Sequence, residues 1–322
     1  MKKMLAIILA LATVFALVSC GGGSDSAEGG KTELVFTTGG ETGTYYAFGG
    51  VIAQSVTANT DVSVTAVSSD GSKANVLLLA AGDAQLGFCQ SDVMAYAFNG
   101  TSTFADVGKV SDFSTVANLY MEQVQIVTCD PSIKSVDDLR GKKVSIGAAG
   151  SGVYFNAIDI LGAYGMTEDD IVANFQNFAD SADSLTDGTI DAAFIVAGAP
   201  TTAITTLATG KDVYLVNLDD EHIDKLMETS PYYSKAVIPA SAYELDSDTT
   251  TVAVGAVVIA RDDVSEDAVY AFVSDLFNNK DSLAHGKAAE LDINFAANVT
   301  AVPYHAGAAK YFAEQGITVP TK

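Results

Sequence analysis

Short β-rich runs alternate with helical stretches along most of this chain, and that alternation restricts the folds open to it. The runs and stretches follow one another in the order 34–36, 45–59, 62–67, 72–81, 85–89 and 91–99. β-branched and aromatic residues dominate the first kind, and apolar residues at helical spacing mark the second. Such alternation is typical of a mostly parallel sheet with helices on both faces. The sequence therefore predicts an α/β fold.

Two unusually long β-rich runs, residues 115–129 and 250–261, enclose a second α/β unit. A chain that leaves one domain and later returns to it needs two crossing strands, and such strands form the hinge of a two-domain clamp. We therefore predict domain I at residues 33–122 and 257–322. Domain II is predicted at residues 123–256.

Each predicted domain has a glycine-rich junction between a strand and a helix, in TTGGETGTYYAFGG (residues 37–50) and in AAGSG (residues 148–152). Ligands bind at the carboxyl ends of strands in open α/β sheets, and exposed N–H groups at a helix N-terminus attract anions. The hydroxyls of Thr42, Thr44 and Ser151 are expected to cap these helices and can also donate to a carboxylate. Ordinary turns are the alternative for each loop alone. The pair of loops, together with the crossing strands, favours a binding cleft between the domains.

Residues 1–20 have the pattern of a signal peptide. Lys2 and Lys3 precede an apolar stretch of about 15 residues, which at ~1.5 Å per residue spans roughly 22 Å and falls short of the ~30 Å bilayer core. The stretch ends in LVSC, which resembles the bacterial lipobox and makes Cys20 the lipidated residue. Residues 21–32 are predicted to be a flexible tether. We expect a lipid anchor on the outer face of the bacterial cytoplasmic membrane, or on the periplasmic side in a two-membrane cell.

The charge balance excludes several classes of partner. Without Lys2 and Lys3 the 17 basic side chains become 15, against 40 acidic ones, which argues against nucleic acid and anionic lipid. Cys89 and Cys129 fall in separate predicted strands, so two unpaired buried thiols are favoured over a disulfide. No Cys/His cluster has zinc spacing, and the glycines at 147–152 have the wrong spacing for a dinucleotide, so we expect neither a metal nor a cofactor.

Several motifs resemble the TAXI family, the solute-binding subunits of certain TRAP transporters. They are GGETGTYYAFGG, SVDDLRGKKVSIGAAGSG, GAPTTAITTLA, VIPASAYELD and YHAGAAKYFAEQGI, in this order. The resemblance covers essentially the whole chain after the signal peptide. It implies a type II periplasmic-binding-protein fold, a monomer, and a small organic anion or amino acid such as glutamate or glutamine as ligand. It also implies delivery to a sodium-coupled TRAP membrane subunit, often a single fused polypeptide.

The same resemblance implies which residues form the cleft. They lie at the two glycine-rich junctions and in neighbouring loops: Thr42, Gly43, Thr44, Tyr45, Ser72, Asn75, Gln90, Ser91, Asp92, Gly150, Ser151, Gly152 and Gly198. Lys73 departs from the family pattern and either pairs with a ligand carboxylate or stays in solvent at a helix end. Asp92 either holds a ligand ammonium or complements a helix dipole. Glu122, on the first crossing strand, is expected to face outward.

Two other functions remain as alternatives. A secreted serine hydrolase would use Ser151 as nucleophile, but a nucleophile elbow reads G-x-S-x-G and this sequence reads AGSGV. The histidines, His222, His285 and His305, are expected far from the strand ends, so we expect no catalytic residue and no enzyme. The second alternative is a ligand-sensing lipoprotein on the same fold that serves no transporter.

Overall fold

The computed structural model describes residues 30–322, of which residues 31–322 form one compact unit. The predicted signal peptide, Cys20 and most of the predicted tether lie outside the described residues. The strands are β1 Thr32–Thr37, β2 Val62–Val67, β3 Leu86–Gln90, β4 Phe113–Thr128, β5 Lys143–Ser145, β6 Val172–Asn174, β7 Ala192–Ala197, β8 Tyr214–Leu215, β9 Ser234–Ile238 and β10 Thr249–Arg261. The helices are α1 Thr44–Asn59, α2 Ser72–Ala81, α3 Ser91–Asn99, α4 Val153–Ala163, α5 Phe178–Thr186, α6 Thr202–Ala208, α7 Asp220–Thr229, α8 Glu266–Asn278, α9 Ile293–Ala296 and α10 Ala306–Glu314.

Within these residues the strands form one mixed sheet in the order β2-β1-β3-β10-β4-β7-β5-β6, with β8 beside β4 and β9 beside β10. β1 pairs in parallel with β2 and β3, and β5 pairs in parallel with β6 and β7. β4 and β10 run antiparallel to each other and to their other neighbours. The sheet is therefore less parallel than the sequence predicted, because the two long strands reverse direction between two parallel sets.

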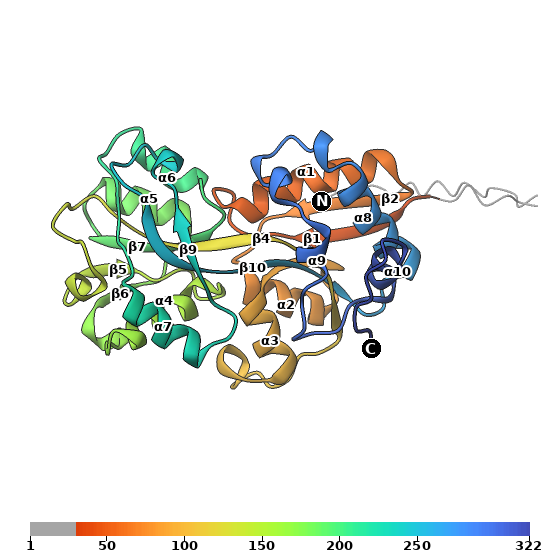
Figure 1. Ribbon diagram of the computed structural model, residues 1–322, viewed down its shortest axis with the longest axis horizontal. Coiled ribbons are helices and arrows are strands. Elements are labelled where there is room, and N and C mark those ends of the chain that lie inside the picture. The colour runs from red at the N-terminus through yellow and green to blue at the C-terminus, as the bar shows by residue number, and fades with distance from the viewer. Residues whose placement is uncertain (1–29) are drawn as a thin grey trace, which may run out of the picture. The chain divides into compact units, whose positions relative to one another are not determined.

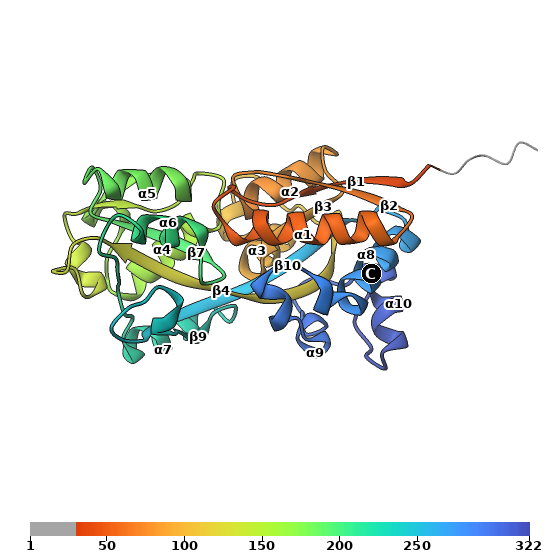
Figure 2. The same ribbon diagram turned by 90° about the horizontal axis from the view of Figure 1, so that it is seen from above.

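The two long strands connect two lobes. β10 pairs with β3 through residues 256–260 and with β9 through residues 249–253. β4 pairs with β7 only through residues 123–128. Figure 1 shows both strands passing from one set of helices to the other, and Figure 2 shows α1 and α2 on one side with α4, α5 and α6 on the other. The predicted α/β fold of the type II periplasmic-binding-protein class, with two crossing strands, is confirmed.

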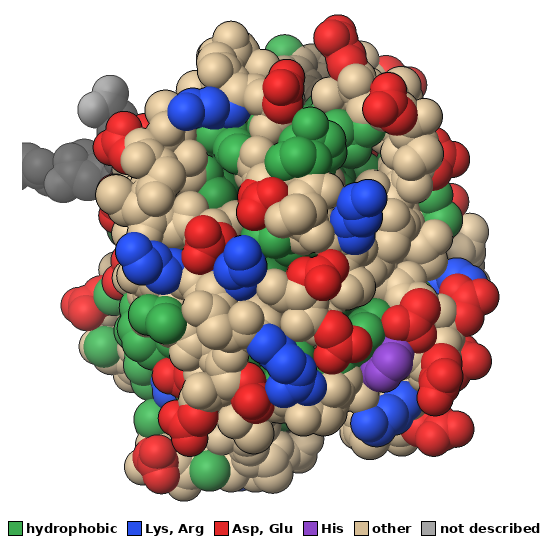
Figure 3. Space-filling view, turned by 90° about the vertical axis from the view of Figure 1, so that its left-hand side faces the viewer, with side chains coloured by type: hydrophobic (Ala, Val, Ile, Leu, Met, Phe, Trp, Pro, Cys, Tyr) green, Lys and Arg blue, Asp and Glu red, His purple; other side chains and the backbone are tan. Residues whose placement is uncertain are grey.

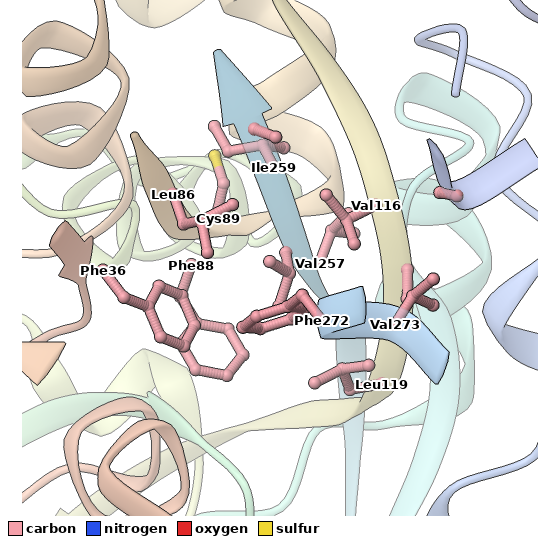
Figure 4. Close-up of a cluster of buried hydrophobic side chains, with 14 of the residues drawn as sticks. Phe36, Leu86, Phe88, Cys89, Val116, Leu119, Val257, Ile259, Phe272 and Val273 are labelled. Carbon is pink, nitrogen blue, oxygen red and sulfur yellow. The ribbon is translucent and has the colours of Figure 1, made fainter. Parts of the chain in front are cut away.

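Each of the two lobes has a hydrophobic core of its own. The core of the first, which we call lobe A, is built from residues 34–120 and 256–319. Phe88 lies at its centre, with its ring stacked on those of Phe36 at 5.0 Å and Tyr45 at 4.5 Å between centroids. Figure 4 shows side chains of this core converging from β1, β3, β4, β10 and α8. Aromatic pairs of this kind add about 0.5–1.5 kcal/mol each beyond the area they bury.

The second lobe, lobe B, has a core on each face of its part of the sheet, and both cores draw on residues 124–254. On the end face of lobe B acidic side chains alternate with lysines and arginines (Figure 3). Cys89 is buried in lobe A, Cys129 is half-buried in lobe B, and both are free thiols. Among residues 30–322, no helix is long and apolar enough to cross a membrane.

Candidate functional site

A cavity of about 60 Å³ lies between the lobes. Apart from Glu122 on β4, its lining comes from the ends of β3 and β7 and from the segments that follow β1, β2, β5 and β6. All six are carboxyl ends of parallel strands, which is where ligands bind in open α/β sheets. The lining consists of Gly39, Gly40, Gly43, Thr44, Tyr45, Ser69, Asp70, Gly71, Ser72, Gln90, Glu122, Ala148, Ser151, Gly152, Val153, Asn177, Phe178, Val196 and Ala197.

The structure brings half of the sequence-predicted ligand residues to this cavity and leaves the others outside its lining. Those that line it are Gly43, Thr44, Tyr45, Ser72, Gln90, Ser151 and Gly152. Those outside the lining are Thr42, Lys73, Asn75, Ser91, Asp92, Gly150 and Gly198. Sequence reasoning also missed Glu122, Asn177 and Phe178. A signal existed for Glu122, a charged residue inside a long β-rich run, but none marked Asn177 and Phe178.

Five helices begin at the cavity, and the residues at their starts are Gly43 for α1, Gly71 for α2, Gln90 for α3, Gly152 for α4 and Asn177 for α5. No side chain caps the first four, whereas the Asn177 side chain accepts from the backbone N–H of α5. An uncapped helix start carries roughly half a positive charge on its free N–H groups. Negative groups are therefore favoured in this part of the cavity.

The predicted hydroxyl caps are wrong for both glycine-rich junctions. Thr44 Oγ1 donates to the Gly198 carbonyl at 2.8 Å, and Ser151 Oγ donates to the Ala148 carbonyl at 2.7 Å. Thr42 makes no cap either, because α1 begins after Gly43 without a side-chain bond. The hydroxyls satisfy carbonyl groups, and the helix N–H groups stay free of side-chain partners.

Several predicted residues outside the lining join one lobe to the other. The Thr42 carbonyl accepts from the Ala203 N–H at 3.2 Å, and the Gly150 carbonyl accepts from the Ala74 N–H at 3.1 Å. Together with the Thr44–Gly198 bond, these are three hydrogen bonds to backbone carbonyls that cross between the lobes around the cavity. These predicted positions lie on the surface where the lobes meet, and the lobes are in direct contact there.

Glycine is required at two positions beside the cavity. A Cβ on Gly152 would lie 1.7 Å from Gln90 Oε1 and 2.9 Å from Val93 Cγ2 across the interface. Gly147 has a φ of +88°, and a Cβ there would lie 2.6 Å from the Val153 Cβ. The glycine-rich junction of lobe B therefore permits both a left-handed turn and the close approach of lobe A.

Asp92 belongs to a buried polar network that also crosses between the lobes. Asn156 Nδ2 donates to Asp92 Oδ2 at 3.0 Å and to the Tyr233 hydroxyl at 2.7 Å. Gln90 Nε2 donates to Asn156 Oδ1 at 3.0 Å. Burial raises the pKa of Asp92 to about 7, and the bond from Asn156 offsets part of that rise. Asp92 thus holds a side chain of lobe B rather than lining the cavity.

Glu122 does not face outward, and that prediction is wrong. Only 2% of its surface is exposed, and it lines the cavity from β4. Burial raises the pKa of Glu122 to about 8; the nearby Tyr45 hydroxyl opposes the rise, Asp92 adds to it and Lys287 opposes it. β4 is covered on both faces where it crosses between the lobes, so strand alternation does not send this side chain to solvent.

Three of the predicted ligand residues have other partners. Asn75 Nδ2 donates to the carbonyls of Thr38 at 2.6 Å and Phe88 at 2.8 Å. Ser91 Oγ accepts from the Gly255 N–H at 3.0 Å. Lys73 Nζ lies 5.6 Å from the ring centroid of Phe104 in lobe A and 5.8 Å from that of Phe155 in lobe B. The Lys73 ammonium is thus placed over aromatic rings at the interface, outside the cavity lining.

The structure does not bring Ser151 and a histidine together as a serine hydrolase would need. Ser151 Oγ bonds a backbone carbonyl, and the cavity lining described above contains no histidine. His222 stacks on Tyr164 in lobe B, while His305 caps the start of α10. Across residues 30–322, no three His, Cys, Asp or Glu side chains are grouped as a metal site.

A family model described as the NMT1-like family matches residues 36–316. Among solved structures, one from Bordetella bronchiseptica RB50 is 14% identical, with a TM-score of 0.54, covering 82% of this chain and 77% of that chain. The GluR0 ligand-binding core from Nostoc punctiforme, in complex with L-glutamate, is 14% identical at a TM-score of 0.48, covering 81% and 98%. The amino acid ABC transporter substrate-binding protein AbpA from Streptococcus pneumoniae, bound to L-arginine, is 16% identical at 0.47, covering 80% and 92%. At this level of identity the likeness concerns the fold alone.

Proposed function

The chain belongs to the NMT1-like family, and from that premise we propose that it is an extracytoplasmic solute-binding protein. In this proposal a small organic anion or amino acid, of the kind that includes glutamate and glutamine, binds between the lobes. The protein then delivers it to a sodium-coupled membrane transporter of the TRAP class. It acts by binding and release and performs no chemical reaction on the solute.

The observation that carries the proposal is the cavity itself. Both lobes line it, and five helices start there, four of them without a side-chain cap. These helix starts support an anionic group on the solute, because their free N–H groups favour negative charge. The volume of about 60 Å³ is below the ~300–1,000 Å³ usual for small-molecule sites. Entry of a solute therefore requires the lobes to move apart about β4 and β10.

Solute binding is expected to raise the melting temperature and to bring the lobes together. At 100 times Kd a ligand stabilises a protein by about 2.7 kcal/mol, which corresponds to several degrees for a chain of this size. A thermal-shift screen with the twenty L-amino acids, dicarboxylates and 2-oxo acids identifies the solute. Small-angle scattering then measures the radius of gyration with and without it. A stabilising solute that leaves the radius unchanged would count against a hinged clamp.

The lipid anchor is a separate part of the proposal. We propose that Cys20 carries the lipid, since LVSC follows an apolar stretch too short to span a bilayer. Metabolic labelling with a lipid precursor is expected to mark the wild-type protein, and Cys20→Ala should be unlabelled and released from the membrane. A Cys20→Ala protein that stays in the membrane fraction would show a second anchor.

A ligand-sensing lipoprotein on the same fold is the alternative that shares the cavity and the anchor. The two functions differ in whether the protein hands its solute to a transporter. Sodium-dependent uptake by a TRAP membrane subunit in proteoliposomes, which starts only when this protein is added, would favour transport. Binding without any such uptake would favour sensing.

A further inference from the structure

The charged side chains in the cavity lining are acidic. Glu122 and Asp70 are both present there, and the described lining contains neither lysine nor arginine. Asp70 is exposed to solvent, whereas Glu122 is buried. An isolated anion entering this cavity would therefore approach a buried carboxyl group. Charge alone does not predict a simple organic anion as the complete ligand.

Glu122 has no charged partner of its own. Lys287 is the basic side chain that acts on it, but Lys287 Nζ pairs with Glu290 Oε1 at 2.6 Å. No ion pair to Glu122 is present among residues 30–322. A buried carboxylate without a partner is costly, so Glu122 is protonated near neutral pH, and binding of a cation would stabilise its ionised form.

Three residues of the cavity lining, Glu122 among them, have buried polar atoms without a hydrogen-bond partner. Tyr45 Oη, Gln90 Oε1 and Glu122 Oε2 are buried, and none of them makes a hydrogen bond in the part of the chain that the structure describes, although the Tyr45 hydroxyl lies close enough to the Glu122 carboxyl to lower the pKa of that carboxyl. All three residues line the cavity. Two of the atoms are acceptors and require N–H or O–H donors, and buried polar groups of this kind are normally satisfied by a partner.

We propose that Glu122 binds an ammonium group of the solute, so that the ligand is an amine-bearing acid and not an acid alone. The inference rests on the proposed function, because it assumes that the cavity holds a solute. Glu122 Oε2 and Gln90 Oε1 accept from the ammonium, and the uncapped helix starts bind the carboxylate. Acceptors from β3 and β4 and donors from α1, α2 and α4 thus fit the two ends of an amino acid separately.

The test compares ligands that differ only in the amino group. Isothermal titration is performed with L-glutamate, L-glutamine and L-alanine, and with glutarate, glutaramate and propionate as their matched acids without nitrogen at the α-carbon. The rest of the L-amino acids are screened by thermal shift. We expect at least one amino acid to bind, and its matched acid to bind at least tenfold more weakly.

Two variants assign the effect to Glu122. Glu122→Gln keeps the shape and removes the charge, and it is expected to weaken amino acid binding by about 10–100-fold, or about 1.4–2.8 kcal/mol at 1.4 kcal/mol per tenfold. Glu33→Gln, at an exposed position of β1, is the matched control and is expected to leave the affinity unchanged. The melting temperature of each ligand-free variant shows that it is folded.

Proton release gives a readout that a merely structural role would not change. Tyr45 on α1, Asp92 on α3, Lys287 after α8, and Tyr120 and Cys89 on β4 and β3 are the titratable groups around Glu122. Since the pKa of Glu122 is about 8, an ammonium ligand at pH 7 ionises the carboxyl and releases about one proton. Titration in buffers of different ionisation enthalpy measures that proton, which should be absent in Glu122→Gln.

The outcomes separate the inference from the function. Matched acids that bind as tightly as the amino acids, with no loss in Glu122→Gln, would overturn the inference and leave solute binding intact. Binding of an amino acid without proton release and without loss in Glu122→Gln would also overturn it. If no amino acid and no acid binds, both the inference and the proposed function fail.

Discussion

Gly152→Ala is expected to lower solute affinity by about 10–100-fold while the protein stays folded, because the added methyl group blocks the approach of the lobes. The Cβ would lie 1.7 Å from Gln90 Oε1 and 2.9 Å from Val93 Cγ2. Gln90 cannot turn aside freely, since it is buried and donates to Asn156. Titration with the identified solute measures the affinity, and small-angle scattering should show a larger radius of gyration with solute than in the wild type.

Gly162→Ala is the matched control on the same helix. Gly162 lies in α4, it is exposed, and a Cβ there would have no neighbour within 4 Å. Alanine in a helix is favoured over glycine by about 0.5–1 kcal/mol, so this variant should melt slightly higher and bind as the wild type does. Wild-type affinity in Gly152→Ala would mean that solute binding does not need the lobe contact seen here.

The free energy of unfolding of the solute-free protein is expected to fall as pH rises from about 5 to about 9. The pKa of Asp92 is raised to about 7 and that of Glu122 to about 8. Between the ordinary and raised values the folded state holds protons that the unfolded state has lost, so each step up in pH favours unfolding. From pH 5 upward the raised pKa spans about 2 units for Asp92 and about 3 for Glu122, so at ~1.4 kcal/mol per unit the two groups together change the stability by roughly 7 kcal/mol.

Calorimetric melts at pH 5, 7 and 9 measure this slope. The double variant Asp92→Asn, Glu122→Gln removes both titrations and keeps an acceptor for Asn156, so its melting temperature should vary much less with pH over the same range. The carboxyls of Asp138 and Asp170 have a lowered pKa, and their contribution to the free energy of unfolding is lost only as the pH falls below the ordinary range of an aspartate. A wild-type melting temperature that is constant from pH 5 to 9 would contradict the buried ionisations.

Local patterns in the sequence predicted the α/β fold well. The strand Val62–Val67 and the helices Ser72–Ala81 and Ser91–Asn99 have the predicted bounds, and β4 and β10 agree to within two residues. Hydrophobic periodicity and the glycines that end helices and strands determine such elements, since both signals extend over only a few residues. The short strand Val172–Asn174 had no prediction, because three residues carry too little pattern.

The candidate site was predicted only in part, because its lining depends on how distant segments meet. The glycine-rich junctions indicated Gly43 and Gly152, but not that Gly152 makes the tighter contact. That difference depends on Gln90, which is far from it in sequence. Asn177 and Phe178 reach the cavity through the pairing of β6 with β5. Glu122 was assigned the wrong direction because alternation along β4 does not reveal where both faces are covered.

The hydrogen bonds between the lobes bear on how a membrane partner could distinguish a loaded protein from an unloaded one. These bonds are Thr44–Gly198, Thr42–Ala203 and Gly150–Ala74. Each joins one lobe directly to the other, so each can form whether or not a solute is bound. A membrane partner that recognised only the closed shape of the protein would also bind protein without solute, and that binding would lead to no transport. In the proposed cycle the Glu122 carboxyl ionises against a solute ammonium, so closure over a loaded cavity is more stable than closure over an empty one, and the membrane partner meets the loaded form more often.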